Sequence, residues 1–159
     1  MKWIYLILCT FYGYVSLGQV SANEVICSDK YKFCFQIPPN QYMLSDGDIE
    51  SEKLSYKNID GKSKIDIENG NIEATTNFHA LFLKIVDNWK KSHSRVNLKK
   101  ELPESFVISG FTQQGRGFYQ KYILNNKRYT SVYFEFPKPA KKYAAISQMI
   151  HDYFMVKNI

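Results

Sequence analysis

Hydrophobic and polar residues alternate along several stretches of the chain, a pattern that predicts β-strands. Tyr31, Phe33 and Phe35 alternate with more polar residues before Pro38, which is typical of a half-buried strand stopped by proline. Two further stretches, 53–58 and 64–68, flank the dipeptide Asp60-Gly61, which tolerates the positive φ angles of a tight hairpin turn. We therefore expect a strand near 31–37 and a hairpin over 53–68. The acidic, turn-rich segment 40–52 between them is predicted to be a loop.

The period of the hydrophobic pattern changes over residues 76–92. Phe78, Leu81, Phe82, Ile85 and Trp89 follow a helical spacing, because they occupy positions i, i+3, i+4, i+7 and i+11. The pattern predicts an amphipathic helix with one apolar face.

Four extended segments follow this helix, at about 97–102, 105–112, 117–124 and 129–136. Short turns separate them, so their strands pair as an antiparallel meander, since such links cannot make the crossover of a parallel pair. After Pro137 and Pro139 the helical spacing returns over 140–154. The predicted class is therefore α+β, an antiparallel sheet meander with helices packed on it, forming a single domain over residues 23–159.

The first 22 residues have the pattern of a signal peptide. Lys2 precedes an apolar run from Trp3 to Tyr14, and the small-residue triplet Val20-Ser21-Ala22 ends the segment. The run is shorter than a bilayer span and polar sequence follows it, which favours cleavage over a retained anchor. We expect a protein that is exported through a cleaved leader and is periplasmic or secreted.

Two cysteines, Cys27 and Cys34, remain once the leader with Cys9 is removed. An even number of cysteines in an exported protein favours a disulfide, and six intervening residues suffice for two short strand ends and a turn. The spacing is not that of a C-x-x-C redox motif, and no histidine lies near enough to complete a zinc set. We predict a structural disulfide between Cys27 and Cys34.

Three segments resemble motifs of the PsbP/Mog-like α/β-sandwich domains that bacteria export. They are Ser105–Gly110, Gly117–Lys121 and Tyr133–Pro137, followed by a terminal helix. The resemblance covers about residues 25–156 and departs from the usual pattern in Phe136-Pro137, where Tyr-Pro is common, and in the cysteine pair. It implies a small extracytoplasmic domain that works by binding, because relatives include an extrinsic photosystem subunit, a nuclear GTPase-binding protein and secretion-system or envelope proteins.

No cluster of residues matches a known catalytic or metal motif. The histidines His79, His93 and His151 lie in different predicted elements without metal-ligand spacing. Asp46, Asp48 and Glu50 alternate like calcium ligands, but the positions where an EF-hand needs glycine and a final acid hold other residues. We therefore expect no enzyme activity, no cofactor and no metal.

The chain has more basic than acidic residues, and several of the basic residues lie in or near the turns of the predicted meander. The chain has 21 Lys+Arg against 15 Asp+Glu, a formal net charge of +6. Nucleic acid is not an expected ligand, because the protein is predicted to be exported and its charge is modest. Loops and sheet edges of such a scaffold present function, so a protein partner is expected at an exposed edge strand or at the turns 113–117 and 125–128. The candidate partner-binding residues are Gln113, Gln114, Arg116, Lys121, Lys127 and Arg128.

Two classes of function remain open. The first is a non-enzymatic exported binding or accessory protein, whose unidentified partner is an acidic protein or, peripherally, the anionic envelope surface. One version of it is an immunity protein that neutralises a toxin delivered to the periplasm. The second class is a hydrolase whose site assembles from separated residues including His151 or His79.

Overall fold

A computed structural model describes residues 24–38, 40–73 and 77–157. The predicted signal peptide, including Cys9, lies outside the described residues. The first half contains the strands β1 (Glu24–Ser28), β2 (Phe33–Ile37), β3 (Tyr42–Asp46), β4 (Lys53–Asn58) and β5 (Lys64–Asn71). The second half contains α1 (Phe78–Lys91), β6 (Arg95–Leu102), β7 (Ser105–Phe111), β8 (Gly117–Asn125), β9 (Arg128–Phe136), the 3-10 helix η1 (Ala140–Tyr143), α2 (Ala144–Tyr153) and β10 (Met155–Val156).

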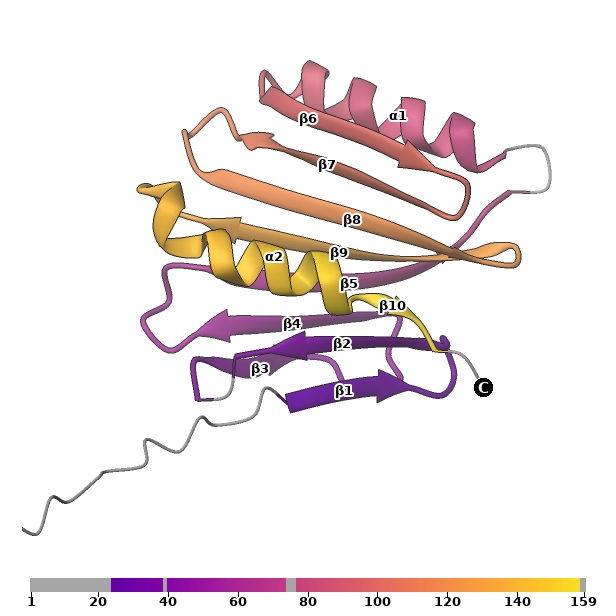
Figure 1. Ribbon diagram of the computed structural model, residues 1–159, viewed down its shortest axis with the longest axis horizontal. Coiled ribbons are helices and arrows are strands. Elements are labelled where there is room, and N and C mark those ends of the chain that lie inside the picture. The colour runs from indigo at the N-terminus through magenta and orange to yellow at the C-terminus, as the bar shows by residue number, and fades with distance from the viewer. Residues whose placement is uncertain (1–23, 39, 74–76, 158–159) are drawn as a thin grey trace, which may run out of the picture.

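Seven of these strands form a large antiparallel sheet in the order β3-β4-β5-β9-β8-β7-β6 (Figure 1). The predicted meander from β6 to β9 is confirmed, as is the hairpin of β4 and β5. The two hairpin systems join where β5 pairs with β9, with Asp66 opposite Tyr133. This non-local pairing places the end of β5 beside the turn between β8 and β9, where Asn71 lies opposite Arg128.

The two faces of the large sheet carry different layers. Side chains alternate between faces along a strand, and in β8 Phe118 and Tyr122 pack in one hydrophobic cluster while Tyr119 and Ile123 pack in another. The first cluster includes the apolar stripe of α1, as the helical spacing predicted. The second includes residues of α2 and of a small sheet ordered β1-β2-β10; in Figure 1, α2 lies in front of the middle of the large sheet and the small sheet lies near β3 and β4. The molecule is therefore an α+β sandwich.

The small sheet begins with the β1–β2 hairpin, which the disulfide closes. Cys27 and Cys34 lie opposite each other, and their sulfur atoms are bonded at 2.09 Å. The predicted disulfide is thus present. On its buried face β2 inserts Phe33 and Phe35 into the core, where each is no more than 1% exposed. β10 pairs with the other edge of β2 and brings the last described residues to the hairpin turn.

Three details differ from the sequence predictions. Segment 40–52 is not entirely loop, because β3 occupies Tyr42–Asp46. Only Tyr42 of this strand is buried, and its register with β4 shifts between Leu44 and Asp46. The alternation of buried and exposed residues that would predict a strand is therefore weak. The closing helical region divides into η1 and α2. The strands β1, β2 and β10 form a second sheet, which short local patterns do not reveal.

Candidate functional site

The structure places the predicted partner-binding residues in three separate locations. Gln113, Gln114 and Arg116 belong to the β7–β8 turn or its edge, whereas Lys127 and Arg128 belong to the β8–β9 turn. The nine residues of β8 separate these turns by about 30 Å, at roughly 3.3 Å a residue. Lys121 lies between them, within the strand. The six residues therefore do not form one surface.

At the β7–β8 turn, the charged group is already bound within the protein. The Arg116 guanidinium forms an ion pair with Glu135 and donates to the backbone oxygen of Lys62 at 2.5 Å. Tyr133 donates its hydroxyl proton to the same Glu135 carboxylate at 2.7 Å. Gln113 and Gln114 are exposed beside it. Arg116 thus links the β7–β8 turn to the β4–β5 turn across the large sheet.

Lys121 is directed beneath α2. Its ammonium donates to the backbone oxygens of His151 and Phe154 at 2.6 and 2.8 Å. These carbonyl groups lie at the C-terminal end of α2, where the helix has unpaired acceptors and a negative partial charge. Burial lowers the pKa of Lys121. Through these two hydrogen bonds Lys121 links β8 of the large sheet to the C-terminal end of α2.

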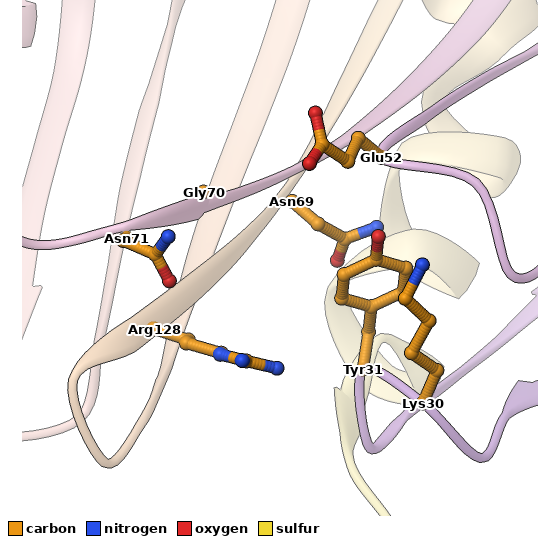
Figure 2. A pocket seen from close by; sticks show the side chains of 7 residues that line it. All are labelled: Lys30, Tyr31, Glu52, Asn69, Gly70, Asn71 and Arg128. Carbon is orange, nitrogen blue, oxygen red and sulfur yellow. The ribbon is translucent and has the colours of Figure 1, made fainter.

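The remaining basic residues meet at the end of the sandwich where the β1–β2 turn approaches the β8–β9 turn. Two adjacent pockets lie there and share Lys30, Tyr31 and Arg128. The first, of about 250 Å³, is called the Arg128 pocket; it is lined by Lys30, Tyr31, Glu52, Asn69, Gly70, Asn71 and Arg128 (Figure 2). The second, of about 460 Å³, adds Lys32, Asn125, Asn126 and Lys127. Together they form what we call the basic cleft.

The β1–β2 turn is held in place by Glu50. This carboxylate accepts hydrogen bonds from the backbone amides of Asp29 and Lys30 and from the Ser28 hydroxyl, each at 2.9 Å. Partial burial alone would raise the pKa of Glu50, but these hydrogen bonds outweigh it and lower the pKa. The Lys30 ammonium donates to the Glu50 backbone oxygen at 3.1 Å. The position of Lys30 and Tyr31 at the cleft is therefore fixed by a charged group that itself stays ionised at neutral pH.

Asn69 forms the back wall of the Arg128 pocket. The residue is 8% exposed, and its side chain accepts from the Thr130 hydroxyl at 2.7 Å and donates to the Ser51 backbone oxygen at 3.2 Å. An amide nitrogen carries two hydrogens, and this Nδ2 has one recorded acceptor. A second N–H therefore remains on a nitrogen that Figure 2 shows on the Lys30 side of the pocket.

The electrostatics of the basic cleft are unbalanced. Four cations, Lys30, Lys32, Lys127 and Arg128, line it with one carboxylate, Glu52. Among the described residues, none of these four side chains forms an ion pair with a carboxylate. The Lys30 ammonium lies over the Tyr31 ring, 4.7 Å from its centroid, and hydrogen bonding to Tyr31 raises the pKa of Lys30. The cleft keeps its positive charge across the neutral range and suits an anionic ligand.

The sequence predicted only part of this cleft. Lys127 and Arg128 were identified from their turn. Lys30 was treated only as part of the cysteine loop, and Tyr31 and Lys32 were assigned to a strand near 31–37, whereas β2 begins at Phe33 and leaves both in the β1–β2 turn. The missing information is that the β1–β2 turn lines the same pocket as a turn about 95 residues further along the chain, and only the tertiary structure brings the two together. A usable local signal was the pair of lysines flanking Tyr31 within a disulfide-closed turn.

The histidines do not contribute to the cleft. His79 Nδ1 contacts the Glu101 carboxylate at 2.9 Å on the α1 side of the sheet, and His151 Nδ1 contacts the Tyr119 hydroxyl at 2.8 Å on the α2 side. No group of three or more His, Cys, Asp or Glu side chains suited to a metal ion occurs within residues 24–38, 40–73 and 77–157. In the same ranges, no helix combines the length and apolarity needed to cross a membrane.

Comparison with known proteins identifies the class of fold. No protein-family model matches the sequence, and no curated protein matches it. The arrangement of sheet and helices is that of a PsbP-like α+β domain. A similar solved structure is the solution structure of cyanobacterial PsbP (CyanoP) from Synechocystis sp. PCC 6803, with a TM-score of 0.66 and 10% sequence identity. The alignment covers 91% of this chain and 98% of that chain, and it confirms the fold expected from the motifs.

Proposed function

We propose that this protein is an exported accessory protein without catalytic activity, and that it binds an acidic segment of a partner protein in the basic cleft. The observation that carries the proposal is the convergence of Lys30, Lys32, Lys127 and Arg128 at one end of the sandwich without carboxylate partners among the described residues. Unpaired cations on preformed turns attract an acidic ligand and lose little conformational freedom when they bind it.

Export is part of the proposal and has separate support. The leader-like sequence at residues 1–22 and the disulfide at Cys27–Cys34 both suit an oxidising compartment. The mass of the natural protein tests it. Cleavage after Ala22 and the absence of free thiols are expected, whereas an intact leader with alkylatable Cys27 and Cys34 would refute this part.

The binding proposal is tested by titrating isotope-labelled mature protein with poly-L-glutamate and recording amide NMR spectra. We expect shifts concentrated in the turns 29–32 and 125–128, with binding that weakens as salt rises, because exposed charges are screened. Poly-L-lysine serves as the control polymer and should leave these amides unchanged. The double variant K127E/R128E should abolish the poly-L-glutamate shifts.

Two results would refute the proposal. One is the absence of poly-L-glutamate binding at low salt, and the other is a response centred on Gln113–Arg116 instead of the basic cleft. Vesicles of anionic phospholipid provide a second arm. If they bind the protein more tightly than the acidic polymer does, at equal charge concentration, the ligand is a lipid surface and the proposed protein partner is wrong.

A further inference from the structure

We propose that the Arg128 pocket is a receptor for a single carboxylate, which serves as the anchor group of the acidic ligand. The inference deepens the proposed function and rests on it for the identity of the ligand as protein. It states more than a general attraction between charges, because it assigns one group of the ligand to one pocket.

The first support is the set of donors that faces the pocket. In Figure 2 the Arg128 side chain extends from β9 toward Tyr31, while the polar ends of Lys30, Tyr31 and Asn69 lie on the other side. Arg128 offers a planar fork of N–H groups that matches the two oxygens of a carboxylate, and Lys30 offers a charged donor. Arg128 has no ion-pair partner among the described residues, so the pocket holds a bidentate donor that nothing in the described chain occupies.

The second support is Asn69, which is independent of the surface charges. Asn69 is 8% exposed as a residue, its side-chain oxygen accepts from Thr130, and its side-chain nitrogen has one N–H beyond the bond to Ser51. A buried donor at the back of a cationic pocket supplies a fixed neutral contact to an anion that enters. Arg128 is held opposite Asn71 by the β5–β9 ladder, and Asn69 lies in the same β5 strand, so these two donors are mounted on strands.

Glu52 defines the limits of the pocket. It lines the same cavity, on the far side from Arg128 in Figure 2, and its negative charge opposes an incoming anion. A volume of about 250 Å³ suits one carboxyl-bearing side chain or a chain terminus. The charged residues that line the pocket are Lys30, Arg128 and Glu52, a net charge of +1, which one carboxylate neutralises and a phosphate dianion exceeds. We infer selection for a carboxylate over phosphate.

The experiment uses small anions that fill only the pocket. N-acetylglutamic acid α-amide presents a side-chain carboxylate, N-acetylglycylglycine presents a terminal one, N-acetylglutamine α-amide is the uncharged match, and inorganic phosphate is the competing anion. Binding is followed through the side-chain amide resonances of Asn69 and Asn71 and the Nε resonance of Arg128. We expect millimolar binding of at least one carboxylate probe and none of the uncharged match, and the carboxylate probe that binds more tightly reveals the source of the anchor.

Three variants give effects of different sign. R128Q should weaken carboxylate binding about tenfold or more, because it removes a charged bidentate donor. E52Q should strengthen it about threefold or more, because it removes a like charge. K99Q is the matched control: it removes an exposed cation from β6, at the edge of the large sheet away from β5 and β9, and should change affinity less than about twofold. Unchanged amide spectra outside the basic cleft confirm that each variant is folded.

The outcomes separate this inference from the proposed function. If poly-L-glutamate binds but no carboxylate probe shifts the Asn69 and Asn71 amides, the Arg128 pocket is not a carboxylate receptor, while the proposed binding of an acidic segment in the basic cleft stands. If the carboxylate probes bind and poly-L-glutamate does not, the Arg128 pocket is a carboxylate receptor but the proposed function is wrong. Tighter binding of phosphate, or equal effects of R128Q and K99Q, would overturn the assignment of a carboxylate to Arg128.

Discussion

Replacing Gly110 by alanine should destabilise the protein at the edge of the large sheet. Gly110 lies in β7 opposite Val96 of β6. A Cβ atom built on Gly110 would lie 2.9 Å from the Arg95 carbonyl carbon and 3.0 Å from the Val96 Cα, and closer still to the Arg95 carbonyl oxygen. All three are backbone atoms, so no side chain can rotate away to make room. The alanine methyl must push β6 off the ladder or leave β7 displaced.

The size of the effect follows from opposing contributions. Overpacking costs about 1 to 3 kcal/mol, and displacement of β6 adds the loss of ladder hydrogen bonds at about 1 kcal/mol each. Restriction of the unfolded chain by alanine returns about 0.4 to 1 kcal/mol. We therefore expect a loss of about 2 kcal/mol in the free energy of unfolding. Urea denaturation measures it, and hydrogen exchange should show faster exchange in β6 than in β9.

Gly61 provides the matched control. It has φ 68°, and an added Cβ would meet no atom within 4 Å. Alanine there suffers only the left-handed backbone strain of about 1 to 2 kcal/mol, partly offset by the same effect on the unfolded chain, for a net loss of about 1 kcal/mol or less. If Gly110→Ala costs no more than Gly61→Ala, the steric account of the Ser109-Gly110 motif is wrong.

Three further changes test the scaffold. Lys121→Met should lower the free energy of unfolding by about 1 to 3 kcal/mol, because α2 loses two charge-assisted hydrogen bonds. Chemical denaturation that shows no loss of stability would contradict the link between β8 and α2. Reducing the disulfide, or replacing both Cys27 and Cys34 by serine, should lower the free energy of unfolding by about 2 to 3 kcal/mol, since the bridge closes a short loop. Thermal melts of the oxidised and reduced protein measure this loss. Burial raises the pKa of Tyr119, Tyr122 and Tyr133, so these groups keep their protons in the folded state above pH 10, where the unfolded chain loses them. Stability should thus be full below about pH 10 and fall as the pH rises beyond it, and a melting temperature that is flat or rising there would refute the burial of these hydroxyls.

The local pattern of the sequence was sufficient for most elements because each strand or helix buries one face. The alternation in β4 and β5 and the helical stripe of α1 correspond to side chains that pack against the core. β3 was missed because it is a short edge strand with an irregular register, in which Leu44 is 49% exposed. β10 has two residues, too few for any period to be detected.

The basic cleft was predicted only in part because its residues come from segments that lie far apart in the chain. The pairing of β5 with β9 brings Asn69 and Asn71 beside Arg128, and no local pattern in either strand specifies that partner. Lys121 is a different case. Its position among polar strand residues suggested a binding surface, whereas strand alternation directs it to the face covered by α2. Assigning the two faces of β8 from Phe118 and Tyr119 would have identified it as an interior contact.

The end of the described chain lies at the mouth of the cleft. The Lys157 backbone amide donates to the Lys32 oxygen at 2.9 Å, and its ammonium pairs with Asp29 at 2.6 Å, while the start of β1 lies at the opposite end of the hairpin, where Glu24 faces Ile37 (Figure 1). A purification tag or fluorescent fusion attached after Ile159 would therefore follow directly on a residue bound to the β1–β2 turn, and could occupy the basic cleft. Immobilisation through the residues just before Glu24 attaches the protein at the other end of the hairpin and leaves the basic cleft open to a ligand.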